Sequence, residues 1–186
     1  MPMTNRFVLS GGPGGGKSAL LAALAERGYP VVPESARAII RSRLQSGLAP
    51  RPEPAAFAQT IFEQDTQHYQ QLQTVDTPCF FDRSVVDALY MLHAAGAMDE
   101  AAVAQQSSAY PYNRTVFFLP PWQAIYQTDG ERDQTFSEAQ RVYANLKRWY
   151  LRWGYDVVDV PCCSVPERVA FVLHAVTQAA EQGGAD

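Results

Sequence analysis

The sequence predicts an α/β fold in which a parallel sheet carries helices on both faces, and three observations lead to this prediction. Short apolar runs typical of buried strands alternate along the chain with longer segments whose apolar residues recur at helical spacing. Glycine, acidic or basic residues follow several of these runs, as is typical of strands that end at a functional edge. The length of 186 residues suits one domain with a sizeable core. We therefore expect a single domain over residues 1–186, with its sheet between two helical layers.

Local patterns place the individual elements. Five strands are expected, at residues 6–10, 30–34, 79–83, 115–119 and 157–160. Helices are expected at 19–27, 36–46, 53–74, 84–95, 99–109, 135–153 and 164–177. Pro30 and Pro33 predict that the second strand lies at a sheet edge or is very short. Capping-box spacing begins the last two helices, at Thr135 and at Ser164.

The second helix is predicted from signals at both of its ends. Ser35 precedes it and is expected to cap it with its side chain. Ile39, Ile40 and Leu44 are expected to form its buried stripe, and Gly47 to end it.

Composition and charge exclude several classes of protein. The net charge is −4, which gives no reason to expect general affinity for nucleic acid or for an anionic membrane. No apolar run approaches the length of a membrane span. Cys79, Cys162 and Cys163 form an odd set without a secretory signal, which predicts a reducing, cytoplasmic location. The scattered histidines show no ligand spacing with these cysteines, so we do not expect a zinc site.

The strongest motif follows the first strand and fits G-x-x-x-x-G-K-[ST], the phosphate-binding P-loop. Glycines let backbone N–H groups surround phosphate oxygens, and the helix that follows adds the positive end of its dipole. Lys17 is expected to reach the β- and γ-phosphates of ATP, and the Ser18 hydroxyl to bind Mg²⁺. The predicted nucleotide site consists of Gly11, Gly12, Pro13, Gly14, Gly15, Gly16, Lys17, Ser18 and Ala19.

Charged residues at two other strand ends are candidates for the chemistry. Asp82 ends an apolar strand, as a carboxylate that holds Mg²⁺ does. Arg83 follows it and either clamps a phosphate or pairs with a carboxylate. Glu34 ends the second strand and can accept the proton of a substrate hydroxyl, and Arg37 can fix a substrate anion. The alternative for Glu34 and Arg37 is an exposed surface charge.

A loop of lid length follows the fourth strand, at about residues 121–135. Phosphoryl transfer spreads negative charge over equatorial oxygens, so a cation that arrives when a lid closes stabilises the transition state. Arg132 is the first candidate for this cation and Arg141, on the next helix, is the second. Trp122 and Tyr126 can either stack on a ring or pack beneath the loop.

The chain resembles the P-loop small-molecule kinases, and most of all the group of AAA-like P-loop domains that includes the ribosylnicotinamide kinase domain of bacterial NAD regulators. The resemblance rests on residues 11–18, 33–37, 81–84, 129–132, 154–155, 160–161 and 167–168. Asp82-Arg83-Ser84 also resembles the Glu-Arg-Ser segment of deoxynucleoside kinases. In those kinases the acid that ends strand two is the base, which implies this role for Glu34. The resemblance further implies a P-loop NTPase fold with strand order 2-3-1-4-5 and a lid arginine on the phosphates.

Two functions are consistent with these features. The first is an ATP- and Mg²⁺-dependent kinase that acts on a hydroxyl of a small molecule, such as a nucleoside. The second is a nucleotide-binding switch or weak ATPase that acts through a partner. The chain has no Asn-Lys-x-Asp guanine motif, so a Ras-like GTPase is not expected. Glu34, Arg37 and the lid favour the kinase, whereas the acceptor, the oligomeric state and the choice between Glu34 and Asp82 as the base stay open.

Overall fold

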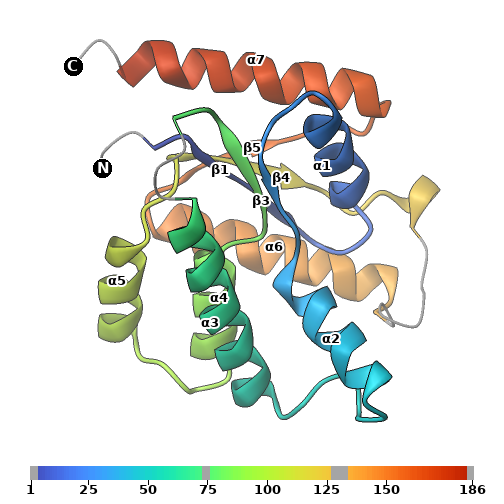
Figure 1. The fold of residues 1–186 in the computed structure, drawn as a ribbon, viewed down its shortest axis with the longest axis vertical. Coiled ribbons are helices and arrows are strands. Elements are labelled where there is room, and N and C mark those ends of the chain that lie inside the picture. The colour runs from blue at the N-terminus through green and yellow to red at the C-terminus, as the bar shows by residue number, and fades with distance from the viewer. Residues whose placement is uncertain (1–3, 73–75, 127–133, 184–186) are drawn as a thin grey trace.

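The computed structural model describes residues 4–72, 76–126 and 134–183, which form a parallel sheet between two layers of helices (Figure 1). The strands are β1 (Arg6–Gly11), β2 (Val31–Val32), β3 (Cys79–Asp82), β4 (Thr115–Leu119) and β5 (Asp156–Asp159). They lie in the order β2-β3-β1-β4-β5, and all neighbouring strands are parallel. The predicted fold class and the strand order are therefore confirmed.

The inner strands are buried on both faces, which explains their nearly unbroken apolar sequences. In β1, Phe7 and Leu9 pack toward α1 (Lys17–Glu26) and α7 (Val165–Gly183), whereas Val8 packs into the opposite layer. The strand β2 lies at the edge, as predicted, but it has only two residues. Pro30 and Pro33 flank it and lack the N–H group that would extend its ladder.

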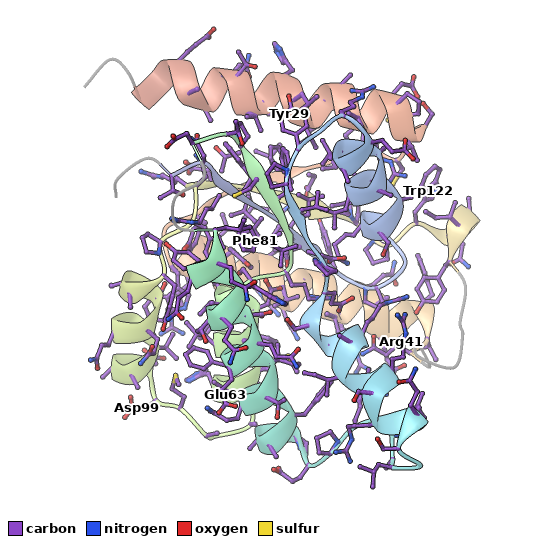
Figure 2. The ribbon with its side chains drawn as sticks, in the orientation of Figure 1. Tyr29, Arg41, Glu63, Phe81, Asp99 and Trp122 are labelled. Atoms are coloured by element: carbon purple, nitrogen blue, oxygen red, sulfur yellow. The ribbon has the colours of Figure 1, made fainter. Side chains whose placement is uncertain are left out.

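The two helical layers differ in size (Figure 1). Only α1 and α7 cover one face of the described sheet. The other face carries α3 (Pro54–Gln71), α4 (Val85–Ala94) and α6 (Phe136–Arg152), with α5 (Glu100–Ala109) packed on α4. Helix α2 (Ser35–Gln45) packs against α3 through the apolar cluster that it shares with α3 and α4. In Figure 2 the ring of Phe81 lies in the interior, whereas Glu63 and Asp99 lie on the outer surface of this larger layer.

Most of the predicted helix ends are confirmed. Thr135 begins α6 with a complete capping box, in which its side chain and that of Glu138 bond each other's backbone. The backbone N–H of Ser164 donates to Glu167 Oε2 at 2.9 Å just before α7. The glycines that end the helices have positive φ angles: Gly28, Gly47, Gly96 and Gly154.

Two expectations for α2 are wrong. Glu34, not Ser35, is the N-cap residue, and Ser35 is the first residue of the helix. The Ser35 hydroxyl donates to Asp65 on α3 instead of capping its own helix. Leu44 is not in the buried stripe, since it is 45% exposed in a last turn that leaves the apolar contacts with α3. Ile39 and Ile40 are buried as predicted.

The segment after β4 begins as a short 3₁₀ turn, η1 (Gln123–Ile125), rather than as irregular chain throughout. The rest of the predicted lid, including Arg132 and Asp129-Gly130, lies outside the described residues. No helix in the described part of the chain is both long and apolar enough to cross a bilayer.

Candidate active site

The P-loop joins β1 to α1 and leaves the start of the helix open to an anion. Gly16 is the N-cap residue, with a φ of 77°, and no side chain caps the helix. Gly14 also has a positive φ, of 80°, and a Cβ on Gly16 would lie 2.8 Å from the Arg168 guanidinium. Glycine is therefore required at both positions, and the uncapped N–H groups of α1 are the donors that a phosphate needs.

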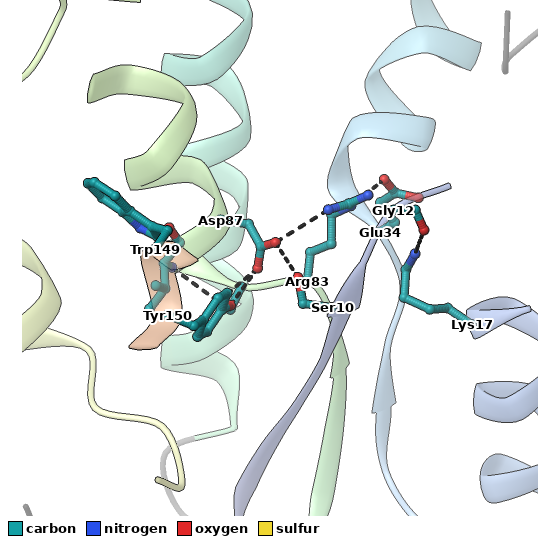
Figure 3. A network of polar contacts seen from close by, with 10 residues as sticks. Ser10, Gly12, Lys17, Glu34, Arg83, Asp87, Trp149 and Tyr150 are labelled. Carbon is teal, nitrogen blue, oxygen red and sulfur yellow. Dashed lines mark hydrogen bonds and ion pairs between the residues drawn. The ribbon is translucent and has the colours of Figure 1, made fainter. Parts of the chain in front are cut away.

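Lys17 is the first residue of α1 and is buried beside this loop. Its Nζ donates to the carbonyl oxygen of Gly12 at 3.3 Å (Figure 3). Burial and the positive charge of Arg83 lower the pKa of Lys17, against the attraction of Asp82 and Glu34. An anion such as a phosphate would stabilise the ammonium form, because it brings negative charge to a buried cation.

Asp82 ends β3 and is only 5% exposed. Its Oδ1 is buried and accepts no hydrogen bond from any described residue. Burial raises the pKa of Asp82 to about 6; Glu34 and Asp87 add to the rise, while Lys17 and Arg83 oppose it. A buried carboxylate oxygen without a donor is a group that a cation would satisfy.

The donor set at this edge fits Mg²⁺ bound together with a nucleotide. Mg²⁺ is held through one or two carboxylates, waters and substrate phosphates rather than by a cage of protein ligands. In the described chain no cluster of three or more His, Cys, Asp or Glu residues could hold a metal by itself. Asp82, with its unsatisfied Oδ1, and Ser18, exposed at the start of α1, are the residues that would hold this ion.

Arg83 turns away from the sheet into the space between α2 and α4. Its φ is 68°, a left-handed conformation that costs a residue other than glycine about 1 kcal/mol or more. Its backbone N–H donates to the carbonyl oxygen of Leu9 at 2.9 Å, which fixes this turn. Its side chain bonds Glu34 at 2.9 Å through Nε and Asp87 at 3.3 Å through Nη1 (Figure 3). Of the two alternatives from the sequence, the carboxylate pair is thus present.

Glu34 lies two residues after β2, at the N-cap of α2, and is bound by Arg83 and, more loosely, by Arg37 at 3.7 Å. Burial alone would raise its pKa, but the charges of Arg83, Lys17 and Arg37 together lower it. Glu34 is therefore ionised at neutral pH. The prediction that Glu34 and Arg37 belong to one site is consistent with this geometry.

Asp87 is the centre of the polar network in Figure 3. Its Oδ1 accepts from Ser10 at 2.6 Å and from Arg83, and its Oδ2 accepts from Tyr150 at 2.6 Å and Ser84 at 3.2 Å. All four donors are protein groups, so no lone pair is left for a substrate proton. Asp87 therefore holds Arg83 in place and is not a candidate base.

A cavity of about 570 Å³ opens beside the P-loop, within the range typical of small-molecule sites. Pro13 and Lys17 border it at the phosphate end, next to Glu34, Arg37 and Arg83. Its other walls come from α2, α3, α4 and α6 and are mostly apolar. The described wall residues that matter below are Ser35, Ile40, Phe57, Ile61, Asp65, Tyr90 and Met91.

Other predicted residues lie apart from this cavity. The side chain of Arg141 is 74% exposed on α6, faces Glu138 at 3.9 Å and does not line the cavity. Ala19 is exposed in the first turn of α1. Tyr126 packs edge-on against Phe136 and covers Gly14, where a Cβ would lie 2.1 Å from its ring. In Figure 2 Trp122 lies at the side of the molecule beyond the P-loop, and the Arg168 guanidinium is 5.8 Å from its ring centre.

Arg168 was not among the predicted site residues, although it belongs to the segment 167–168 on which the family resemblance rests. It lies in the first turn of α7, is 4% exposed, and donates from Nη1 to the carbonyl oxygen of Gly15 at 3.0 Å. Its Nε is buried without a partner among the described residues. Arg168 thus ties the start of α7 to the P-loop, 153 residues away in sequence.

Comparison with known proteins agrees with this geometry. The family model described as "AAA domain" matches residues 6–168. The chain belongs to this family. No curated protein sequence matches it.

Solved structures match the fold of this AAA domain protein over almost its whole length. Deoxyadenosine kinase from M. mycoides, with the products dCMP and dCDP bound, matches with a TM-score of 0.63 at 11% sequence identity. The match covers 93% of this chain and 99% of the kinase chain. Thymidylate kinase from Candida albicans has a TM-score of 0.61 at 16% identity, with 93% and 91% covered. The YorR protein from Bacillus subtilis, in complex with phosphorylated GDP, has 0.56 at 14% identity, with 95% and 98% covered. The fold is therefore that of the P-loop nucleoside and nucleotide kinases, as the resemblance implied.

Proposed function

We propose that this protein is an ATP- and Mg²⁺-dependent phosphotransferase that moves the γ-phosphate to a hydroxyl group of a nucleoside-like molecule. The observation that carries the proposal is the cavity that adjoins Lys17 and has Glu34 and Arg83 in its wall. A nucleotide switch or simple ATPase binds no acceptor molecule, so its function does not require a cavity of this size beside the phosphate site. The resemblance to kinases that act on nucleosides and nucleotides supports the same reading.

The reaction divides among the residues at the carboxyl edge of the sheet. The acceptor oxygen attacks the γ-phosphorus, the bond to the β-phosphate oxygen breaks, and the acceptor proton passes to the Glu34 carboxylate. The N–H groups at the start of α1 and Lys17 bind the phosphates. Asp82 and Ser18 would hold Mg²⁺, which would supply positive charge at the phosphate oxygens.

The lowered pKa of Glu34 determines whether this residue acts mainly as a base or mainly by orienting the acceptor hydroxyl. A carboxylate paired with Arg83 is a weak base, because the arginine stabilises its charged form. Phosphoryl transfer through a loose transition state needs only late proton removal, so orientation of the hydroxyl is the larger contribution. Arg83 keeps the carboxylate fixed, and Asp87 keeps Arg83 fixed.

The test is transfer of labelled γ-phosphate to a panel of nucleosides and nucleoside monophosphates, measured beside hydrolysis of ATP. We expect transfer to at least one acceptor, with a loss of roughly 10²-fold in Glu34→Gln and unchanged ATP affinity. Arg152→Gln is the matched control, because Arg152 is exposed on the far end of α6 and pairs with Glu100. ATP hydrolysis without transfer to any acceptor in the panel would contradict the proposal and favour a switch or ATPase.

A further inference from the structure

A second acidic residue, Asp65, lines the cavity in the middle of α3. It is 7% exposed, and its Oδ1 accepts a hydrogen bond of 2.5 Å from the Ser35 hydroxyl. Ser35 is adjacent to Glu34 and is held in turn by contact with His68 Nδ1 at 3.5 Å. This arrangement fixes the Asp65 carboxyl near the reactive end of the cavity.

The partners of Asp65 are few for a buried carboxyl. Asp87 is 3% exposed and receives four hydrogen bonds from described residues, whereas Asp65 is 7% exposed and receives one, from Ser35. An ionised carboxylate has room for about four donors, so Asp65 keeps capacity for more. Because Asp65 lines the cavity, a further donor can be a ligand.

The charges around Asp65 agree with this view. Burial raises the pKa of Asp65 to about 7, and the negative charges of Asp87 and Glu34 add to the rise. The Ser35 hydrogen bond and Arg83 oppose it without cancelling it. A ligand N–H that donates to the carboxylate would stabilise its charged form in the same way as the Ser35 hydroxyl does.

Other residues that line the cavity offer apolar surface to a flat ring. Phe57 and Ile61 come from α3, and Tyr90 and Met91 come from α4, on the neighbouring side. A hydroxyl compound that reaches Glu34 would therefore lay its apolar ring between these helices, with the ring edge near a carboxyl. When Asp65 is ionised it can only accept, so the ring edge needs a hydrogen-bond donor rather than a carbonyl oxygen, because two acceptors repel.

We propose that Asp65, oriented by Ser35, is a specificity residue that binds an exocyclic amino group on the acceptor's heterocyclic ring. This proposal depends on the proposed function in one respect, which is that the cavity binds the acceptor. It names the acceptor class as amino-bearing nucleosides. Asp65 binds the ring, Ser35 positions the carboxyl, and Glu34 and Arg83 bind the reacting end.

The experiment uses pairs of nucleosides that differ by one amino group. The pairs are adenosine and purine riboside, guanosine and inosine, and cytidine and pyrimidin-2-one riboside, together with their 2′-deoxy forms. Both kcat/KM for phosphate transfer and Kd by calorimetry are measured with the full chain. We expect the amino member of the preferred pair to be favoured by about 10- to 100-fold, the range for a hydrogen bond to a charged group.

Substitutions at Asp65 and Ser35 distinguish a role in amino-group specificity from a purely structural role. Asp65→Asn and Ser35→Ala should reduce the preference within the pair, mainly by raising KM for the amino member. Glu63→Gln is the control, since Glu63 lies on the exposed side of the same helix (Figure 2). Far-ultraviolet circular dichroism confirms that each variant folds.

The outcomes distinguish this inference from the proposed function. If transfer occurs but Asp65→Asn leaves the amino preference unchanged, or lowers kcat equally for both members of every pair, the inference is overturned and the kinase stands. If no transfer occurs but calorimetry shows an amino preference that Asp65→Asn removes, the inference stands and the kinase fails. Binding without any amino preference in wild type overturns the inference whatever the activity.

Discussion

Two regions on either side of Arg83 differ in how many hydrogen bonds their buried carboxylates receive. On the α4 and α6 side, Asp87 borders the cavity but is saturated by protein donors from four separate positions. On the P-loop and α3 side, Asp82 has an oxygen without a donor and Asp65 has a single donor among the described residues. The first region is built to hold a shape, and the second leaves bonding capacity for a ligand. Stability and activity should therefore respond differently to the same Asp-to-Asn change in the two regions.

The largest difference between the effect on activity and the effect on stability is expected for Asp82→Asn. Loss of the carboxylate should reduce the transfer rate by roughly 10²–10⁴-fold, because a catalytic metal ion contributes several kcal/mol to the transition state. Folding stability at pH 8 should stay the same or rise, since burial raises the pKa of Asp82 and its charge is unfavourable in the fold. The rate is measured against Mg²⁺ concentration, and stability by urea denaturation. If Asp82→Asn kept both the wild-type transfer rate and the wild-type Mg²⁺ midpoint, Asp82 would be a structural residue.

Asp87→Asn should give the reverse pattern, with a loss of stability of about 2–4 kcal/mol. The amide keeps the size of the side chain but places an NH₂ group against the hydroxyls of Ser84 and Tyr150 or against Ser10. It also leaves Arg83 with one carboxylate instead of two. Urea denaturation at pH 7.5 measures the effect, with Asp99→Asn as the exposed control. A stability equal to wild type would remove the distinction between the two regions.

The sequence predicted one of these regions far better than the other. The P-loop, Asp82 and Glu34 could be found because each is marked by neighbours in the chain: a glycine motif, or a charge directly after an apolar strand. The positions of the carboxyl ends of parallel strands then bring them to one edge. The fold followed from the same local patterns, and the strand order from the family resemblance.

The remaining site residues depend on partners distant in sequence. Asp87 lies within an apolar helix and meets Ser10, 77 residues earlier. Asp65 lies in the glutamine-rich helix α3, and it meets Ser35, 30 residues earlier. Ser35 itself had the local pattern of a helix cap, so its side-chain partner on another helix could not be foreseen. Only tertiary packing, of α4 beside β1 and of α2 against α3, brings these groups together.

Arg168→Met tests whether the P-loop side also depends on a distant support. Loss of the guanidinium leaves the Gly15 carbonyl without this donor and frees the loop from α7. We expect ATP affinity to fall by about 10- to 100-fold, with a smaller change in the rate at saturation, because the residue positions the loop without touching the acceptor. Arg168→Lys should restore part of the affinity. Calorimetric titration of ATP with Mg²⁺ gives the Kd, and Arg152→Met, an exposed arginine paired with Glu100, is the control. Unchanged affinity in Arg168→Met would mean that the P-loop holds its shape alone.

The smallest expected effect is the pH dependence of stability in Asp65→Asn. The pKa of Asp65 is about 7 in the fold, against 3.8 as the ordinary value for aspartate. Between these two values the folded chain holds a proton that the unfolded chain releases, so this residue destabilises the fold progressively as pH rises. Replacement by the neutral amide removes this cost, about 4 kcal/mol at most, but it also weakens the hydrogen bond from Ser35. We therefore expect a net gain of about 1–2 kcal/mol at pH 8 that shrinks steadily toward pH 4.

The comparison of variant and wild type in the same buffers isolates Asp65 from its titratable neighbours. Glu34 on the α2 side, Asp87 and Arg83 on the α4 side and Tyr112 are present in both proteins. Melting temperature is followed from pH 4 to pH 8, where 1 kcal/mol corresponds to roughly 2–4 °C for a chain of this size. Glu63→Gln, exposed on α3, should show no such trend. A gain that did not vary with pH would mean that the Asp65 carboxyl is already fully satisfied by Ser35, and the cavity would then hold no acid that still needs a donor.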